Sequence, residues 1–339
     1  MADDEARVLH AARRSGLLAP GRPVVVMLSG GQDSVCLLDV AVRLCGREAV
    51  CALHVNYRLR TEAAQDERHC LDLCRSLGVP LHVERPPRLR RGNVQAWARD
   101  IRYRAAGRLA DDRDATVAVA HTATDQVETV LYRLAASPGR RALLGMRPRE
   151  ERVVRPLLDV SRDQTAGYCR ARGLTWREDE TNRGDRYARA RVRERLLPAL
   201  RSVHPAAEAN VLRTAELLRD EGQVLDALVD GELADGGRIT VERLSAMPTA
   251  LRRLVVRRMA EDAAGRPAPD AARRVDEIVA VGTRRTRASI DLGGGLRALL
   301  ERGELSFAAG PAHPGWQRWR ARLTRRPRAA GGQLPPGSG

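Results

Sequence analysis

The most constraining feature of this chain is a short glycine-rich segment at residues 29–34, Ser-Gly-Gly-Gln-Asp-Ser, which directly follows an apolar run at residues 23–28. An unbroken run rich in valine is typical of a strand buried in a parallel sheet. Apolar residues then recur at helical spacing over residues 35–43. The segment therefore predicts a strand-to-helix turn, whose free backbone N–H groups and helix dipole attract an anion.

The residue types in this turn suit a bound phosphate group. Gly30 and Gly31 let the backbone approach the phosphate closely, Ser29 and Ser34 add hydroxyl donors, and Asp33 can hold a magnesium ion against phosphate oxygens. A Walker loop would need a lysine, but all 59 basic residues of this chain are arginine. The site must therefore work through backbone amides, hydroxyls, metal and arginine. A glycine turn that only joins strand to helix is the alternative.

Strand and helix patterns alternate over the first half of the chain. Apolar segments at residues 24–28, 49–55, 81–84 and 116–120 predict strands, and the segments between them predict helices. This alternation predicts an α/β fold with a doubly wound, Rossmann-like parallel sheet. Such sheets bind ligands beyond the carboxyl ends of their strands. The glycine-rich loop, His54 and the pair His121-Thr122 all fall at those ends.

The second half of the chain changes character. We expect residues 1–205 to form the nucleotide-binding domain and residues 206–235 a linker helix. A smaller mixed α+β domain should follow at 236–309, with helices at 251–264 and 270–281 and short strands at 288–292, 296–300 and 305–308. The end of the chain, residues 310–339, is rich in proline, glycine and arginine, which predicts a disordered tail.

The charge balance indicates a polyanionic partner. The chain carries 59 basic and 43 acidic residues, a net charge of +16, which favours a nucleic acid. A genome-wide codon bias toward arginine is the alternative. The six cysteines are interpreted as reduced thiols. Because no signal-peptide core or bilayer-length apolar stretch is found, we expect a cytoplasmic protein without membrane attachment.

Three further segments carry candidate site residues. In the segment 121–129, Asp125 can hold magnesium or bind a substrate amine, although helix capping would also explain an acidic residue there. Arg99 and Arg102 share one face of a predicted helix and could clamp phosphates, or they could simply be exposed. Arg191 and Arg193 either lie at the reaction centre or face solvent.

These segments together resemble a known family. The loop alone resembles the ATP pyrophosphatases with a Ser-Gly-Gly-x-Asp-Ser motif, which cut ATP into AMP and pyrophosphate. The ordered set resembles tRNA(Ile)-lysidine synthetases, in a short form without an extra C-terminal domain. The matching segments are SGGQDS (29–34), HVNYRLR (54–60), NVQAWARDIRY (93–103), HTATDQVET (121–129), RPLLDVSR (155–162), EDETNR (178–183) and RVRERLLP (191–198). Residues 293–307, GGGLRALLERGELSF, resemble the family's second domain.

The resemblance implies a ligase that joins free L-lysine to the wobble cytidine in the anticodon loop of an isoleucine tRNA. ATP would adenylate the base, and the lysine amine would then displace AMP, with ATP and Mg2+ as cofactors and a possible homodimer. The implied catalytic residues are Asp33, Arg99, Arg102, Asp125, Arg191 and Arg193, with Asp33 and Asp125 as metal ligands. The implied nucleotide-binding residues are Ser29, Gly30, Gly31, Gln32, Asp33, Ser34, His54, His121 and Thr122.

The chain departs from the family pattern at three places. Asn56-Tyr57 stand where the family often has Asp-His, Thr124 replaces an aspartate, and Ala190 replaces an asparagine. Three alternatives to lysidine formation stay open. They are a tRNA-thiolating enzyme, although no Cys-x-x-Cys pair is present, an inactive RNA-binding relative, and an enzyme that amidates a small acid.

Overall fold

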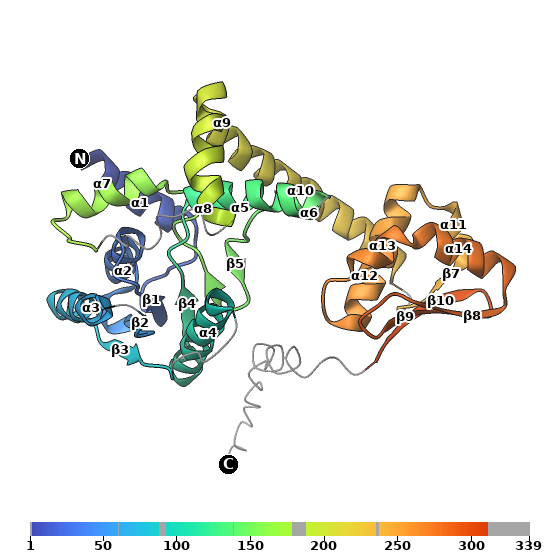
Figure 1. Cartoon of the computed structure of the whole chain (residues 1–339), viewed down its shortest axis with the longest axis horizontal. Helices are drawn as coiled ribbons and strands as arrows, with labels where there is room; N and C mark the ends of the chain where they lie inside the picture. Colours follow the sequence, from blue (N-terminus) through green and yellow to red (C-terminus); the bar gives the residue numbers. More distant parts are fainter. Residues whose placement is uncertain are drawn as a thin grey trace, which may run out of the picture. The chain divides into compact units, whose positions relative to one another are not determined.

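The computed structural model describes residues 2–59, 61–87, 93–137, 139–177, 188–234 and 237–310 (Figure 1). The chain divides into two compact units, Met1–Arg219 and Asp220–Gly339. Each unit has its own sheet, and among the described residues hydrophobic cores form separately in the two units, two in the first and one in the second. Of the tail predicted at 310–339, residues 311–339 lie outside the described residues, as does the motif at 178–183.

The first unit is built on a six-stranded sheet in the order β3-β2-β1-β4-β6-β5. The strands β1 (Val24–Met27), β2 (Val50–Val55), β3 (Leu81–Glu84), β4 (Thr116–Ala118) and β6 (Val153–Val154) run parallel. Only the short edge strand β5 (Arg149–Glu150) is antiparallel. The predicted doubly wound parallel sheet is thereby confirmed. The strand order reverses beside β1, and this switch point is where such sheets bind ligands.

Helices cover both faces of this sheet because the side chains of β1 alternate between them. Val24 and Val26 pack into a core with α1 (Ala2–Arg14), α2 (Gln32–Cys45), α3 (Ala63–Leu77) and α7 (Arg162–Ala171). Val25 and Met27 pack into a second core with α4 (Val94–Arg113). Since both faces are buried, the strand is apolar throughout. Figure 1 shows α4 and α2 on opposite sides of the strands.

Several elements differ from the sequence-based expectation. The helix predicted at 187–200 is interrupted: α8 (Ala188–Arg191) leads into a π-helical turn at Val192–Leu196 and then α9 (Leu197–Val203). Pro198 explains the break, because it has no N–H group and its ring clashes with the carbonyl one turn earlier. The helix α5 (Ala123–Ala136) was expected, whereas α6 (Arg140–Leu143) and the β5–β6 hairpin were not. Elements of two to four residues are too short to show a period.

The second unit contains a four-stranded antiparallel sheet in the order β7-β10-β9-β8. Its strands are β7 (Ile239–Thr240), β8 (Arg287–Asp291), β9 (Leu296–Glu301) and β10 (Glu304–Ala309). Its helices are α11 (Val241–Ala246), α12 (Thr249–Ala264), α13 (Pro269–Arg273) and α14 (Val275–Arg284). The predicted mixed α+β unit is confirmed. The long helical pattern at 206–233 corresponds to α10 (Ala207–Glu232), which continues from the first unit into the second.

In the described part of the chain, no helix is long and apolar enough to cross a membrane.

A buried ionic network joins α2 to α7. The Tyr168 hydroxyl, fully buried on α7, donates to Asp39 Oδ2 on α2 at 2.5 Å, and Arg172 Nε donates to the same oxygen at 3.2 Å. Burial, followed by the hydrogen bond to Asp39, raises the pKa of Tyr168. Because α2 follows the glycine-rich loop directly, the network fixes the position of α7 relative to that loop.

We therefore expect Tyr168→Phe to destabilise the protein. The substitution removes one hydrogen bond to a buried carboxylate, which costs about 1.5–3 kcal/mol. Urea denaturation would measure the change, with Tyr132→Phe as the control because Tyr132 is 38% exposed. Equal stability changes in the two variants would contradict a structural role for the network.

Candidate active site

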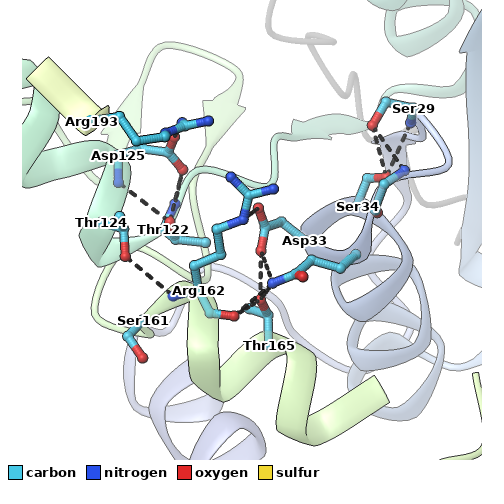
Figure 2. Close-up of polar contacts among 12 residues, drawn as sticks. Ser29, Asp33, Ser34, Thr122, Thr124, Asp125, Ser161, Arg162, Thr165 and Arg193 are labelled. Atoms are coloured by element: carbon cyan, nitrogen blue, oxygen red, sulfur yellow. Dashed lines mark hydrogen bonds and ion pairs between the residues drawn. The ribbon is translucent and has the colours of Figure 1, made fainter. Parts of the chain in front are cut away.

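The glycine-rich loop folds into a tight turn between β1 and α2. The Leu28 N–H group donates to the Leu53 carbonyl at 2.8 Å, so the loop starts from the sheet edge. The Ser29 and Ser34 hydroxyls lie 3.0 Å apart, and Ser34 Oγ also accepts from the Ser29 N–H group (Figure 2). No described side chain caps the amino end of α2 at Gly31. The N–H groups of Ser34 and Val35 donate to the Gly31 carbonyl, each at 3.0 Å, so those of Gln32 and Asp33 are the ones that can bind an anion.

Gly30 is required by the geometry of this loop. Its φ angle is +88°, in the left-handed region, and an added Cβ atom would lie 3.3 Å from Cys70 Sγ. Its carbonyl accepts a hydrogen bond from the Arg177 N–H group at 3.0 Å. Arg177 is itself held by Asp66 on α3, at 2.6 Å. The turn is therefore supported from behind by two other segments of the first unit.

Asp33 lies in the first turn of α2, with its side chain only 21% exposed. Its Oδ1 atom accepts hydrogen bonds from Thr165 Oγ1 at 2.5 Å and from Gln32 Nε2 at 3.4 Å. Its Oδ2 atom faces Arg162 Nε at 3.9 Å. Burial raises the pKa of Asp33, and the hydrogen bond from Thr165 and the charge of Arg162 oppose that rise only in part.

Asp125 belongs to the capping box of α5. Its Oδ2 atom accepts from the Thr122 N–H group and from Thr122 Oγ1, both at 2.8 Å, so the capping role considered from the sequence is real. Its Oδ1 atom faces a guanidinium nitrogen of Arg193 at 3.9 Å. Its charge also contributes to the raised pKa of Asp33, so each carboxylate lies within range of the other's charge. Capping and a site role are therefore compatible.

Arg193 is anchored by a buried carboxylate. Its Nε and one terminal nitrogen donate to the two oxygens of Glu128, at 2.5 and 3.1 Å, and the Glu128 side chain is 4% exposed. The hydrogen bond to Glu128 raises the pKa of Arg193, against the opposing effect of burial. Glu128 thus holds Arg193 beside Asp125. Arg191, by contrast, has an exposed side chain on α8.

The two predicted nucleotide-binding histidines occupy different environments. His121 Nδ1 accepts a hydrogen bond at 3.3 Å from Arg155 Nε, on a side chain that is itself buried. This contact leaves the His121 proton on Nε2. His54 is buried, its Nδ1 atom lies 3.0 Å from the Leu28 carbonyl, and burial lowers its pKa. His54 therefore supports the end of β1, and its described contacts are not with the space in front of the loop.

The predicted arginine clamp lies on α4. Asn93 caps this helix, accepting from the N–H groups of residues 95 and 96. The guanidinium of Arg99 stacks 4.6 Å above the Tyr103 ring. Arg102 Nε is buried and has no partner among the described residues. No contact between described residues links these two arginines to Asp33 or Asp125, so their role in the site stays a prediction.

Sequence reasoning missed Glu128, which anchors Arg193, and three further residues that shape the site. Thr165 and Arg162 approach Asp33 from α7, and Arg155 orients His121. Arg155 and Arg162 lie inside the quoted motif at 155–162, which was the available signal. Thr165 had no signal, because a threonine in a helix is unremarkable until its partner is known.

The described residues contain no group of three or more histidine, cysteine, aspartate or glutamate side chains that could hold a metal ion alone. Asp33 and Asp125 nevertheless each have one oxygen without a hydrogen bond from the described residues. Magnesium in nucleotide sites is usually bound by one or two carboxylates together with phosphate oxygens. The pair therefore fits Mg2+ bound jointly with a nucleotide.

The family model for the PP-loop domain matches residues 3–200, which assigns the first unit, with its parallel sheet and the glycine-rich loop at the switch point, to the PP-loop domains. The tRNA(Ile)-lysidine synthase of Gloeobacter violaceus is 36% identical over 265 residues, covering 74% of this chain and 80% of that protein. That of Symbiobacterium thermophilum is 36% identical over 91% of this chain and 69% of its own length. The chain belongs to the tRNA(Ile)-lysidine synthase family.

Other comparisons show how much of a relative's length the chain matches and which fold it shares. The tRNA(Ile)-lysidine synthase of Thermus thermophilus is 38% identical over 261 residues, 74% of this chain, but the match spans about half, 51%, of that protein. Among solved structures, the U34-tRNA thiolase NcsA from Methanococcus maripaludis aligns with a TM-score of 0.53 and 16% identity, over 63% of this chain and 78% of that chain. This structural match shows a shared fold alone.

We expect Asp33→Asn to stabilise the protein at neutral pH. Because burial raises the folded-state pKa above the ordinary value of 3.8, the folded protein binds the proton more tightly than the unfolded chain. Stability is therefore lost as pH rises from 3.8 through the raised pKa. Asparagine carries no such charge and can still accept from Thr165.

Chemical denaturation of the parent protein and of Asp33→Asn, from acidic to neutral pH, would test whether the substitution raises the free energy of unfolding. The advantage of the variant should vanish below pH 3.8, where the carboxyl group is protonated in both states. Asp112→Asn, at an exposed position on α4, serves as the control. A variant less stable than the parent at neutral pH would contradict the prediction.

Proposed function

We propose that this chain is a tRNA(Ile)-lysidine synthase, which joins free lysine to the wobble cytidine of an isoleucine tRNA at the expense of ATP. The observation that carries the proposal is that Asp33 and Asp125, which follow two neighbouring strands, each face an arginine at 3.9 Å. Family membership supports the substrate assignment. The alternation of acidic and basic groups suits a nucleotide, magnesium and a positively charged amine together.

In the first step, a ring carbonyl oxygen of cytidine attacks the α-phosphate of ATP. A carbon-bound oxygen gains a bond to phosphorus, the bond to the bridging oxygen breaks, and pyrophosphate leaves. The loop N–H groups and the Ser29 hydroxyl would bind phosphate oxygens, whereas the buried Ser34 hydroxyl donates to the Gly31 carbonyl at 2.8 Å and shapes the turn. Magnesium, held by Asp33 and Asp125, would neutralise charge on the phosphates. The step turns a poor leaving group into AMP.

In the second step, the side-chain amine of lysine attacks the activated carbon. A carbon–nitrogen bond forms, the carbon–oxygen bond to AMP breaks, and the nitrogen releases a proton. We assign Asp125 to orient the incoming amine, since its Oδ1 atom accepts no hydrogen bond from the described residues. Arg193, held by Glu128, then lies where it can stabilise the departing phosphate.

The proposed contacts with tRNA involve residues outside the glycine-rich loop. A groove of about 570 Å³ at the carboxyl ends of β2 and β3 is lined in part by Arg58, Arg68, Arg85 and Glu67. Together with the net charge of +16, this groove favours a phosphate backbone. We also propose that the second unit binds tRNA, as the resemblance of its last strands implies.

Sulfur transfer is the weaker alternative because of the state of the cysteines. All six are buried and free. Burial raises the pKa of Cys70 to about 12 and that of Cys74 to about 12. Since the thiolate is the nucleophilic form, neither thiol is prepared to carry sulfur at neutral pH.

Mass analysis of the tRNA tests the proposal directly. An isoleucine tRNA with a wobble cytidine should gain the mass of lysine less one water when incubated with the protein, ATP, Mg2+ and labelled lysine. One pyrophosphate and one AMP should appear for each modification. A tRNA with uridine at the wobble position is the control substrate. Product that requires a sulfur donor, or no product at all, would refute the assignment.

We expect Arg193→Ala to lose both stability and activity. Adding Glu128→Gln to this variant should show which of the two losses depends on the buried charge of Glu128. Removing Arg193 takes away the two hydrogen bonds that its guanidinium donates to the buried Glu128 carboxylate, at a cost of about 2–4 kcal/mol given the partial exposure of the arginine. Adding Glu128→Gln removes that buried charge and should recover most of the stability. Lysidine formation should stay reduced by about 100-fold or more in the double variant. If activity returns together with stability, Arg193 has only a structural role.

A further inference from the structure

The two site carboxylates share one pattern of contacts. In each, one oxygen accepts hydrogen bonds from neutral donors, and the other faces a guanidinium at 3.9 Å. The partners are Arg162 for Asp33 and Arg193 for Asp125. Figure 2 shows Arg162 extending from α7 toward Asp33, near Asp125. In the described structure, each carboxylate is thus compensated by one arginine.

The two arginines differ in how firmly they are held. Arg193 makes a two-pronged hydrogen-bonded pair with Glu128. The Arg162 side chain is 45% exposed, and the contact of its guanidinium with the described residues is the long ion pair to Asp33. Such an exposed pair contributes little free energy. Arg162 can therefore leave Asp33 at small cost, whereas Arg193 cannot leave Glu128 cheaply.

The backbone of Arg162 is fixed even though its guanidinium is not. Its N–H group donates to Thr124 Oγ1 at 3.3 Å, and its carbonyl accepts from Gln32 Nε2 at 2.6 Å. Gln32 belongs to the loop itself, and Thr124 stands beside Asp125. The side chain is therefore tethered at the site with its charged end able to turn. Thr124, a departure from the family pattern, thus contributes a contact that positions Arg162.

We propose that Arg162 is an exchangeable counter-charge and a phosphate ligand of the nucleotide site. Without nucleotide, it neutralises Asp33. When Asp33 becomes a ligand of Mg2+ in the nucleotide complex, Arg162 turns away and donates to a phosphate oxygen. The inference rests on the proposed ATP site and adds a residue to it. Its physical reason is that Mg2+ and the Arg162 guanidinium would repel each other if both lay at Asp33 Oδ2, while a polyphosphate attracts further positive charge.

The proposal predicts effects of opposite sign in one variant. In Arg162→Gln, Mn2+ without nucleotide should bind more tightly, by about fivefold, because the competing charge on Asp33 has been removed. The Mg2+ complex of α,β-methylene ATP, whose α–β bridge cannot be cleaved, should bind about tenfold more weakly, because a charged phosphate contact is lost. Electron paramagnetic resonance would measure Mn2+ binding, and calorimetry would measure nucleotide binding.

Two further variants control the experiment. Arg162→Lys retains the charge, so it should keep Mn2+ binding weak and restore part of the nucleotide affinity. Arg170→Gln removes an exposed arginine from the same helix and should change neither measurement. A merely structural role for Arg162 would weaken both kinds of binding together. Weakening of both, or unchanged Mn2+ binding in Arg162→Gln, would overturn the proposal.

The result of these binding measurements can be distinguished from the result of the lysidine assay that tests the proposed function. Suppose that Arg162→Gln binds Mn2+ more tightly and the nucleotide more weakly than the unsubstituted protein, but that the unsubstituted protein forms no lysidine. The substrate assignment then fails and the role of Arg162 stands. If the protein forms lysidine but Arg162→Gln does not change the two affinities in opposite directions, only the proposed role of Arg162 is refuted.

Discussion

The site depends on the attachment of α7 to α2, the helix that follows the glycine-rich loop. The attachment has two parts, a buried one through Tyr168 and Asp39 and a half-buried one through Thr165 and Asp33. The first holds the helices in register. Because the helices are in register, the Thr165 hydroxyl reaches the Asp33 carboxylate at the loop. Without the buried part, the loop would retain its turn but lose the residues that orient Asp33.

Electrostatic balance explains why carboxylates and arginines alternate around this loop. A phosphate site needs positive charge, and its magnesium needs carboxylates, yet carboxylates that are partly buried without compensation destabilise the fold. The raised pKa of Asp33 shows that its compensation is incomplete. The chain thus keeps a site that is slightly unfavourable when empty, and the proposed binding of a divalent cation together with a nucleotide would supply the missing positive charge.

Local features were predictable from the sequence because their physical cause is local. The apolar run at 23–28 and the glycines after it predicted β1 and the turn, and the capping role of Asp125 was among the alternatives. The break at Val192–Leu196 was not predicted, although Pro198 was visible, because the helical pattern of apolar residues continues through it. The place of His54 at a strand end predicts a site residue, but the side to which its side chain turns depends on packing.

The sequence by itself determined the sheet, the loop and the family, since strand period, glycine conformation and the order of motifs are all written along the chain. Only the tertiary structure decided which residues meet at the loop. Thr165 reaches Asp33 across 132 positions, and Arg193 reaches Glu128 across 65. No spacing rule connects residues so far apart, because their distance in space is set by the packing of helices on the sheet.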